Sequence, residues 1–367
     1  MRIFIYEQKK LYRFPVIWFI FVLFLSFNVF TIYGMVGNSD FRENIEAVYD
    51  VITGKKTGGE YYDFYEQYKK DYSDIYINFN MNEIKNMKED MSKFYPSGSY
   101  KEFIDNNYKK LQKRVEEIIA SNDTDADFYP GDSFQIHGKL YKFLSQCIIE
   151  MMLIMCFSVL YLMDFERINR TEDIVFSSST GRKNMWIKWC AGIFNGLVFS
   201  VILIVAGLTL FFTYVPMKGL MDVPISSYMV MESSGILEYP FISFVRLTIR
   251  QELILNIVTA FLIVLLAGVI AGAVHIFVNN SYISMICIAA GFVGLMWFGL
   301  TIQRADWIKT FACMNPAVLW LCCGRWFIEN DMAVSFNWSE FWNLGVWGIM
   351  AVLLGMCGMR CFKKKDI

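Results

Sequence analysis

Six long apolar segments constrain the fold of this chain more than any other feature of its sequence. They cover residues 14–37, 143–163, 189–215, 254–277, 282–302 and 341–359. A transmembrane helix needs about 20 consecutive apolar residues, and each segment is close to that length. Glu150 is the only Asp, Glu, Lys or Arg inside any of them. The sequence therefore predicts an all-α polytopic membrane protein with six transmembrane helices, the second of which we place at 141–163.

The composition agrees with a membrane protein and excludes several classes of function. Hydrophobic residues make up 55% of the sequence and charged residues 19%, against about 25% charged residues in globular proteins. The net charge of −1 leaves no basic excess for a phosphate backbone, so we expect no nucleic-acid partner. Two histidines, His137 and His275, are too few for a multi-histidine site, and we expect no metal.

The sequence carries no recognisable catalytic motif. There is no HExxH, GxSxG or GxGD pattern, and no GxxxxGK[ST] loop that could hold ATP. The nearest fragment, Gly-Lys-Lys-Thr at 54–57, lacks the spacing of a phosphate-binding loop. We therefore expect no catalytic residues, no enzyme activity and no cofactor bound by this chain, so any ATP-driven work would depend on another protein.

The distribution of lysine and arginine predicts the orientation in the membrane. Cytoplasmic segments next to transmembrane helices carry an excess of these residues. Here they gather in residues 1–13, in the loop 164–188 and in the tail 360–367. If the six helices alternate, both termini lie in the cytosol, the protein lies in the cytoplasmic membrane, and 216–253 is an extracellular loop. The first apolar segment is too long for a signal peptide, so we expect an uncleaved anchor.

The polar segment 38–140 is expected outside the cell as a helical domain. Residues 38–138 contain 20 acidic residues, 13 basic residues and no cysteine. Asp40, Asn80 and Ser99 each precede a glutamate by three residues, which is typical of a helix start. The acidic excess suits a cationic partner, although a solvated acidic surface also explains it.

Tyrosines recur at helical spacing in this domain. The positions are Tyr61, Tyr65, Tyr68, Tyr72 and Tyr76. They could form an aromatic surface that grips a substrate, or one face of a helix in the domain core. We favour the core, because periodic apolar faces usually pack inside.

Polar residues inside the apolar segments are candidates for function. An ionisable group in hydrocarbon costs about 2.5–3.5 kcal/mol, so Glu150 should face the bundle interior or a cavity. We name Glu150 and Asn195 as candidates for a translocation pathway. For Glu150, a protonated carboxyl group hydrogen-bonded to a neighbouring helix is an equal alternative. His275, near the inner end of the fourth segment, is expected to be an interfacial packing residue.

Small residues and cysteines leave two further questions open. Gly268-x-x-x-Gly272 permits close approach of two helices, either within this chain or across a dimer. Cys313, Cys322 and Cys323 lie in the outer segment 303–340, where a disulfide could form.

The loop 164–188 contains a candidate docking element. Thr171 can cap a short helix that holds Glu172 and Asp173 in its first turn, where carboxylates suit the helix dipole. Ile174 and Phe176 give this helix an apolar side. It could be a knob that docks a soluble partner, or a plain interfacial helix between two transmembrane segments.

Several of these features, in this order, resemble the type 2 ABC exporter permeases. The loop looks like the coupling region of that family, with its acidic start, short apolar helix, Ser/Thr-rich turn, Arg182 and Lys188. The amphipathic segment 1–13 is similar to its interfacial connecting helix. Asn315-Pro316, in the segment 303–340, resembles its re-entrant outer hairpin, and the ending 362–367 resembles its common C-terminus. The large domain 38–140 departs from relatives that have a short first outer loop.

The resemblance implies a membrane-spanning permease subunit of an ATP-driven ABC exporter. Its partners would be the lipid bilayer, a second permease in a homo- or heterodimer, and separate ABC ATPase subunits that hold ATP and Mg. The cargo would be an amphipathic peptide, drug or lipid, and the acidic domain favours an antimicrobial peptide. The alternative is a membrane-anchored sensor or antimicrobial-peptide immunity protein without transport activity.

The resemblance also assigns roles to individual residues. The implied ATPase-coupling residues are Glu172, Asp173, Ile174, Phe176, Arg182 and Lys188. We expect Arg182 and Lys188 to anchor the loop to anionic headgroups. Asn315 and Pro316 would close the outer end of the transport pathway.

Overall fold

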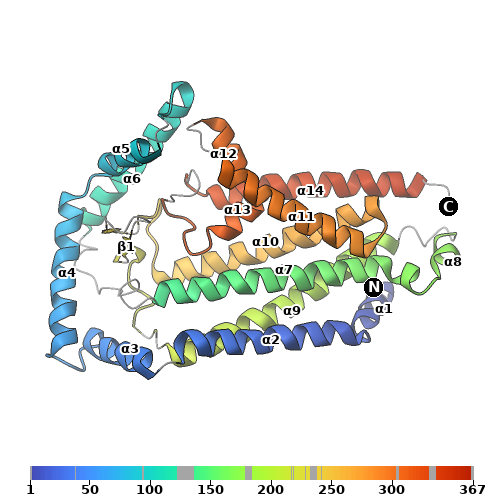
Figure 1. Cartoon of the computed structure of the whole chain (residues 1–367), viewed down its shortest axis with the longest axis horizontal. Helices are drawn as coiled ribbons and strands as arrows, with labels where there is room; N and C mark the ends of the chain where they lie inside the picture. Colours follow the sequence, from blue (N-terminus) through green and yellow to red (C-terminus); the bar gives the residue numbers. More distant parts are fainter. Residues whose placement is uncertain are drawn as a thin grey trace.

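The protein is a bundle of six long helices with a smaller helical domain at one end (Figure 1). The computed structural model describes residues 2–37, 39–92, 95–121, 136–177, 184–215, 217, 219–227, 229–231, 238–240, 242–302, 306–329 and 336–364. The helices long and apolar enough to cross a membrane are α2 (Pro15–Val36), α7 (Ile136–Ile168), α9 (Asn184–Tyr214), α10 (Ile249–Val278), α11 (Ser281–Thr301) and α14 (Ser339–Lys364). The predicted six-helix membrane fold is confirmed.

A tight connection joins α10 to α11. Asn279 ends α10 in the left-handed conformation, with φ of 53°, which asparagine tolerates better than most residues. The side chain of Asn280 then caps α11 by accepting a hydrogen bond from the backbone N–H of Ile283, at 3.1 Å. These two asparagines explain how the fourth and fifth helices turn back with almost no loop between them.

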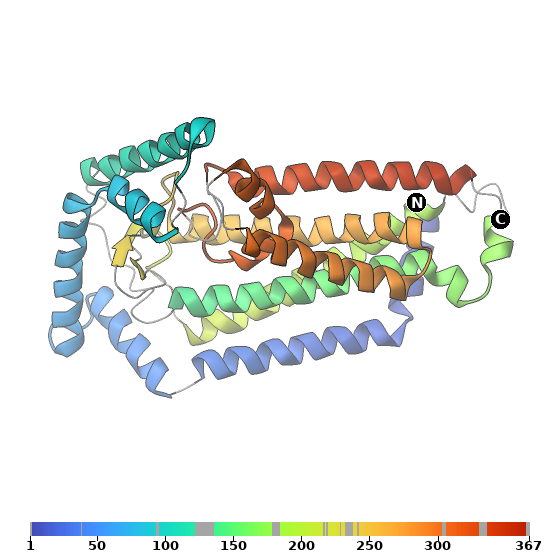
Figure 2. The ribbon, with the colours of Figure 1, turned by 45° about the horizontal axis from the view of Figure 1, so that its top comes forward.

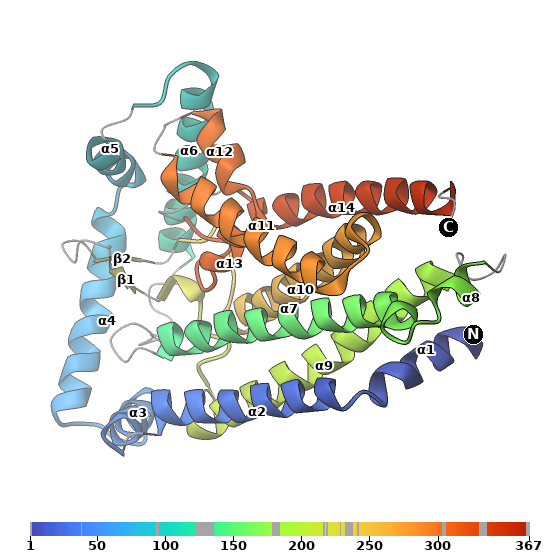
Figure 3. The same ribbon diagram turned by 45° about the vertical axis from the view of Figure 1, so that its right-hand side comes forward.

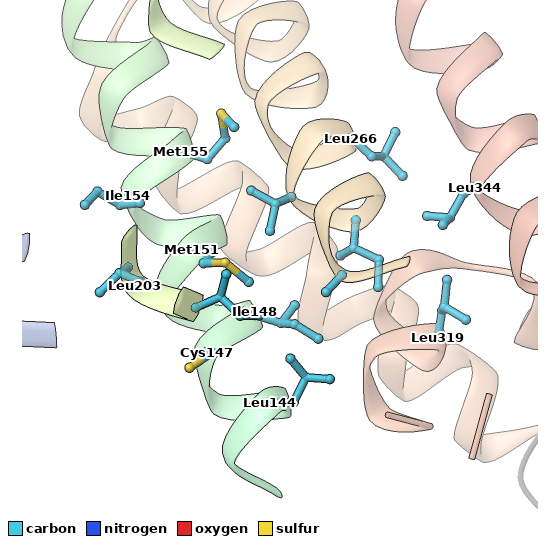
Figure 4. Packing of buried hydrophobic residues seen from close by; sticks show 14 of the residues in the cluster. Leu144, Cys147, Ile148, Met151, Ile154, Met155, Leu203, Leu266, Leu319 and Leu344 are labelled. Carbon is cyan, nitrogen blue, oxygen red and sulfur yellow. The ribbon is translucent and has the colours of Figure 1, made fainter. Parts of the chain in front are cut away.

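Helix α7 lies at the centre of the bundle, packed against α9, α10 and α2 (Figures 1 and 4). Many of its apolar residues are buried, and Leu144, Ile148 and Met151 are fully so. Gly192 and Gly196 of α9 allow the backbones of α7 and α9 to approach each other. A Cβ atom at Gly192 would lie 2.6 Å from the Cα of Val159, closer than packing permits. Close helix contact at small residues is a common way to associate helices in lipid.

The glycine pair of α10 packs within the chain. A Cβ atom at Gly268 would lie 2.7 Å from the sulfur of Met155, and one at Gly272 would lie 2.2 Å from the ring of Trp189. The indole N–H of Trp189 also donates to the backbone carbonyl of Gly268 at 3.1 Å. This settles the question left open by the sequence: the motif holds α10 against α7 and α9.

The helical domain consists of α3 (Ser39–Ile52), α4 (Glu60–Asn78), α5 (Met81–Ser92) and α6 (Gly98–Ala120). Figure 2 shows α4 crossing one end of the bundle, roughly perpendicular to the long helices. We call this end the domain end. The opposite end, which carries the first and last described residues, is the loop end.

The domain shares its core with the connection between α9 and α10. Tyr76, Leu111 and Val115 are buried together with Ile242 from that connection. The hydroxyl of Tyr76 donates to the backbone carbonyl of Ser226 at 3.0 Å. The same connection forms a small antiparallel ribbon, β1 (Met229–Met231) and β2 (Glu238–Pro240). The core of the domain therefore includes residues from the connection between α9 and α10.

Two tyrosines of the α4 stripe, Tyr65 and Tyr76, are buried in separate clusters. Tyr76 is fully buried, and Tyr65 is buried against Val51 of α3, as the core interpretation requires. Tyr61 is half-buried in the second cluster, and the side chains of Tyr68 and Tyr72 lie outside the described residues.

Two short helices, α12 (Trp307–Cys313) and α13 (Pro316–Leu321), form a turn between α11 and α14 at the domain end (Figure 3). Cys313, Cys322 and Cys323 are all free thiols in this structure, which contains no disulfide among them. This turn sits where the sequence placed the re-entrant segment.

Candidate functional site

The short helix α8 (Glu172–Phe176) projects from the loop end, between α7 and α9 (Figure 3). The side chain of Ile174 is 75% exposed, and Asp173 is exposed. Glu172 lies 3.5 Å from the guanidinium of Arg167, the nearest charged residue of α7. An exposed apolar residue beside two carboxylates makes α8 a surface that a soluble protein could bind.

Local hydrogen bonds tie α8 to the end of α7. The backbone N–H of Thr171 donates to the carbonyl of Glu166 at 2.8 Å, and the Thr171 hydroxyl donates to the same oxygen at 3.3 Å. Thr171 is the N-cap residue of α8, as expected, but its hydroxyl donates to α7 and makes no capping hydrogen bond. Phe176 ends α8, but its side chain is not among the described ones, and Arg182 lies outside the described residues.

The last turn of α7 carries a buried ion network. One oxygen of Glu166 lies 3.0 Å from the ammonium of Lys10, on helix α1 (Arg2–Tyr12), and the other pairs with the ammonium of Lys188, on α9. Lys10 also pairs with Glu7 at 2.7 Å. Glu166 and Lys188 are both buried. Removing one partner of a buried pair typically costs about 3–5 kcal/mol, so this network holds α1, α7 and α9 together.

Asp164, in the same turn, holds the α10–α11 connection. Its carboxylate accepts hydrogen bonds from the backbone N–H of Ser281 at 3.2 Å and from the Ser281 hydroxyl at 2.8 Å. Its other oxygen lies 4.0 Å from the imidazole of buried His275. The end of α7 thus contacts α1, α8, α9, α10 and α11, and we call Asp164, Glu166 and Arg167 the hub.

The position of Lys188 differs from the expected one. The sequence placed its ammonium at anionic headgroups, but only 2% of the side chain is exposed and it pairs with Glu166. Spacing alone could not reveal this, because basic residues at the end of a transmembrane helix are ordinarily topology signals. The signal that could have found it is the acidic pair Asp164 and Glu166, which closes the preceding helix.

An apolar cleft of about 370 Å³ lies between the middle parts of α7, α10 and α11. Met152, Leu266 and Phe292 are among its walls, and none of its lining residues is charged. Pro316 of α13 and Trp347 of α14 also line it. Volumes of this order are typical of small-molecule sites.

Glu150 lies on another face of α7 from this cleft. Asn28 of α2 donates to its carboxylate at 2.7 Å, and Gln146 donates to its other oxygen at 3.1 Å. Gln146 also reaches Asn28 and Thr31, both on α2. The arrangement matches the structural alternative for Glu150, a carboxyl group held by a neighbouring helix. It does not support the prediction that Glu150 lines a translocation pathway through the cleft.

Asn195 is also separate from the cleft. It is fully buried in α9, and its amide donates to the carbonyl of Ala191 one turn earlier, at 2.8 Å. The structure therefore brings neither pathway candidate to the apolar cleft.

Asn315 is the residue that shapes the α12–α13 turn. Its side-chain oxygen accepts hydrogen bonds from the N–H groups of Ala317 and Val318 at 3.0 Å, which caps α13. Its amide donates to the carbonyl of Ala312 at 2.7 Å and to that of Leu295 at 3.3 Å. Asn315 thus links α11, α12 and α13 through hydrogen bonds and determines where α13 begins, at Pro316.

Another buried carboxylate lies near the domain end. Glu252 of α10 is 1% exposed and is hydrogen-bonded to the hydroxyl of Tyr141 and the amide of Asn256. The sequence interpretation missed it because the fourth apolar segment was begun two residues later. The spacing of Glu252 and Asn256, one helical turn apart, was the available signal.

No family model, no curated protein and no solved structure matches this chain. Among the described residues, no group of three or more His, Cys, Asp or Glu side chains could hold a metal ion.

Proposed function

We propose that this chain is the membrane-spanning permease subunit of an ATP-driven ABC exporter. The observation that carries the proposal is the course of α7. This single helix joins the exposed helix α8 at the loop end to the apolar cleft at its middle. Near its domain end it meets α13, where the indole of Trp320 donates to the Ser145 carbonyl at 2.9 Å.

In this proposal, α8 docks a separate ATPase subunit. Ile174 would enter an apolar pocket of the partner, and Glu172 and Asp173 would face its basic groups. Movement of α8 would pass to the hub through the hydrogen bonds between Thr171 and Glu166. Because the buried network ties Glu166 to α1 and α9, these helices would move with α7 as one body.

The cleft suggests what kind of cargo is carried. A pathway lined only by uncharged, mostly apolar residues favours a molecule with a substantial apolar portion. An amphipathic peptide, drug or lipid meets this requirement, and the acidic composition of the helical domain favours a cationic antimicrobial peptide among them. Pro316 and the α12–α13 turn would close the domain end of the cleft.

The charge distribution suggests the orientation of the proposed permease, and the resemblance to type 2 ABC exporter permeases implies its partners. The loop end, with the basic residues of the terminal segments, would face the cytosol, and the helical domain would lie outside the cell. ATP and Mg would bind to the partner ATPase, and a second permease would complete a homo- or heterodimer in the cytoplasmic membrane.

Co-purification tests this proposal. The chain is tagged at the C-terminus, extracted from its membrane in mild detergent, and compared with the double variant Glu172→Lys/Asp173→Lys. We expect a P-loop ATPase to follow the wild type in stoichiometric amount and to be lost from the variant, because the docking carboxylates are reversed. Glu43→Lys/Glu46→Lys, which reverses two exposed charges of α3 instead, is the matched control and should retain the ATPase.

A different result supports the alternative function. If the wild type purifies without any ATPase and the α8 variant still protects cells from a cationic peptide, the permease proposal is wrong. The chain would then be a sensor or an immunity protein that works without transport.

A further inference from the structure

An aromatic cluster joins the helical domain to α12. The ring of Trp307, the first residue of α12, lies 5.0 Å from the ring of Phe103 and 5.5 Å from that of Tyr100, both on α6. Phe336 packs edge-on against Phe103 at 5.9 Å. The indole N–H of Trp307 also donates to the hydroxyl of Ser99 at 3.2 Å. We call Tyr100, Phe103, Trp307 and Phe336 the aromatic clamp.

The clamp is the place where the first turn of α6 rests on the bundle. Tyr100 is 5% exposed there, so its ring is largely enclosed although the residue lies in a polar domain. Further along α6, the hydroxyl of Tyr108 donates to the carboxylate of Glu329 at 2.9 Å. Helix α6 is therefore held at the clamp, at Glu329 and in the core that it shares with Ile242. Within the described part of the chain, the clamp is its aromatic contact with α12.

From α12, a continuous set of hydrogen bonds leads to the cleft. Asn315 bonds to the carbonyl of Ala312 in the last turn of α12 and caps α13. The indole of Trp347 donates to the carbonyl of Met314, between the two short helices, at 2.8 Å. Pro316 and Trp347 both line the cleft. A displacement of α12 would therefore move two residues of the cleft wall.

We propose that the helical domain controls the closure of the cleft at the domain end through the aromatic clamp. With the clamp intact, α6 holds α12 against the end of α11, where the ammonium of Lys309 donates to the Gly299 carbonyl at 2.9 Å. A ligand that pulls α6 away from Trp307 releases α12 and loosens the turn at Asn315. As a means of regulating export, this control rests on the function proposed above.

A native cysteine reports on the position of α12. Cys313 lies in its last turn, is 4% exposed, and its thiol points to the carbonyl of Gly299 at 3.6 Å. In full-length protein reconstituted in lipid nanodiscs, a water-soluble maleimide is added and the modification rate of each cysteine peptide is followed by mass spectrometry. Cys147, which is fully buried in α7, monitors global unfolding in the same sample.

The decisive variant is Phe103→Ala, because this residue belongs to the domain and not to α12. We expect it to raise the modification rate of Cys313 by about tenfold, the shift in a local opening equilibrium that an aromatic contact can supply. Trp307→Ala should do the same, and the double variant no more than either alone. Trp307→Phe should keep most of the protection, because it retains a ring. Trp342→Ala, which removes an exposed ring from α14, is the control and should have no effect.

Two results would overturn the proposal. One is a wild-type rate at Cys313 in Phe103→Ala, and the other is an increase at Cys313 only together with an equal increase at Cys147. The labelling requires neither ATPase nor cargo. A negative labelling result would therefore refute the clamp proposal alone, and the permease proposal would still be tested by co-purification. Conversely, if the labelling gives the expected rates but no ATPase co-purifies, the proposal for the clamp stands and the permease proposal is wrong.

Discussion

Removing either member of the Glu166–Lys188 pair should destabilise the protein by different amounts. Glu166 is the centre of the network, because its two oxygens contact Lys10 at 3.0 Å and Lys188 on opposite sides. In Lys188→Met the carboxylate keeps Lys10 as its partner, whereas in Glu166→Gln the nearly inaccessible Lys188 loses its carboxylate. The second variant should therefore be the less stable one.

The magnitudes follow from the burial of the pair. Breaking a buried ion pair so that one charge stays uncompensated costs about 3–5 kcal/mol, which we expect for Glu166→Gln. In Lys188→Met, Glu166 loses one of its two ion pairs and keeps the one with Lys10. We expect a smaller cost of about 1.5–3 kcal/mol, the size of one interaction with a charged group. The double variant Glu166→Gln/Lys188→Met should be no less stable than Glu166→Gln alone, since no unpaired ammonium remains.

Equilibrium unfolding of the purified protein in mixed detergent micelles, with increasing SDS, measures these differences. Arg167→Gln is the matched control, because it removes a charge of the same turn whose side chain is 45% exposed, and exposed pairs contribute about 0–1 kcal/mol. The reasoning is refuted if Lys188→Met is the less stable single variant, or if the effects of the two substitutions simply add.

Three further predictions concern the bundle and the domain end. Tyr141→Phe removes the hydroxyl bound to buried Glu252 and should lower the free energy of unfolding by about 1–3 kcal/mol in the same SDS titration; no change would mean that Asn256 alone satisfies the carboxyl group. Gly272→Ala places a methyl group 2.2 Å from an indole ring and should cost about 1–3 kcal/mol, whereas Gly291→Ala, with nothing within 4 Å, should be neutral; equal stabilities would contradict this packing. Asn315→Ala removes the cap of α13 and should cost about 1 kcal/mol and speed hydrogen exchange in that helix, and unchanged exchange would show that the cap is dispensable.

The six-helix bundle could be predicted because hydrocarbon imposes long, uncharged helices on any chain that crosses it. The helix at 341–359 can be predicted from composition alone, since an apolar segment of that length that crosses hydrocarbon must be helical. The ends of the helices were predicted less accurately. Helix α7 begins at Ile136, five residues before the expected start, because a helix can continue in polar sequence beyond the hydrocarbon.

The partners of individual charges could not be predicted. Lys188 and Glu166 are 22 positions apart and separated by a whole loop, and only the packing of α7 against α9 brings them together. Glu150 was recognised as unusual, but its partner Asn28 lies 122 positions earlier. A sequence shows which side chains are costly to bury, while the tertiary contacts determine how that cost is offset.

The core of the helical domain shows the same limitation. The tyrosine periodicity of α4 indicated a packed face, and Tyr65 and Tyr76 are indeed buried. It could not indicate that Ile242, from a different loop, completes the core. Likewise, nothing in the local sequence of Trp307 indicates that Phe103 is its neighbour.

The central claim is that α8 docks a P-loop ATPase, and a photo-crosslink from Ile174 tests it most directly. Because this side chain is 75% exposed, a photoreactive phenylalanine analogue fits there without disturbing the bundle. The same analogue at Tyr95, which is 65% exposed in the helical domain, serves as the control. After irradiation of living cells, we predict that position 174 captures a protein with a P-loop ATPase sequence and that position 95 does not. Capture of only lipid, or of a protein without that sequence, at position 174 would contradict the account.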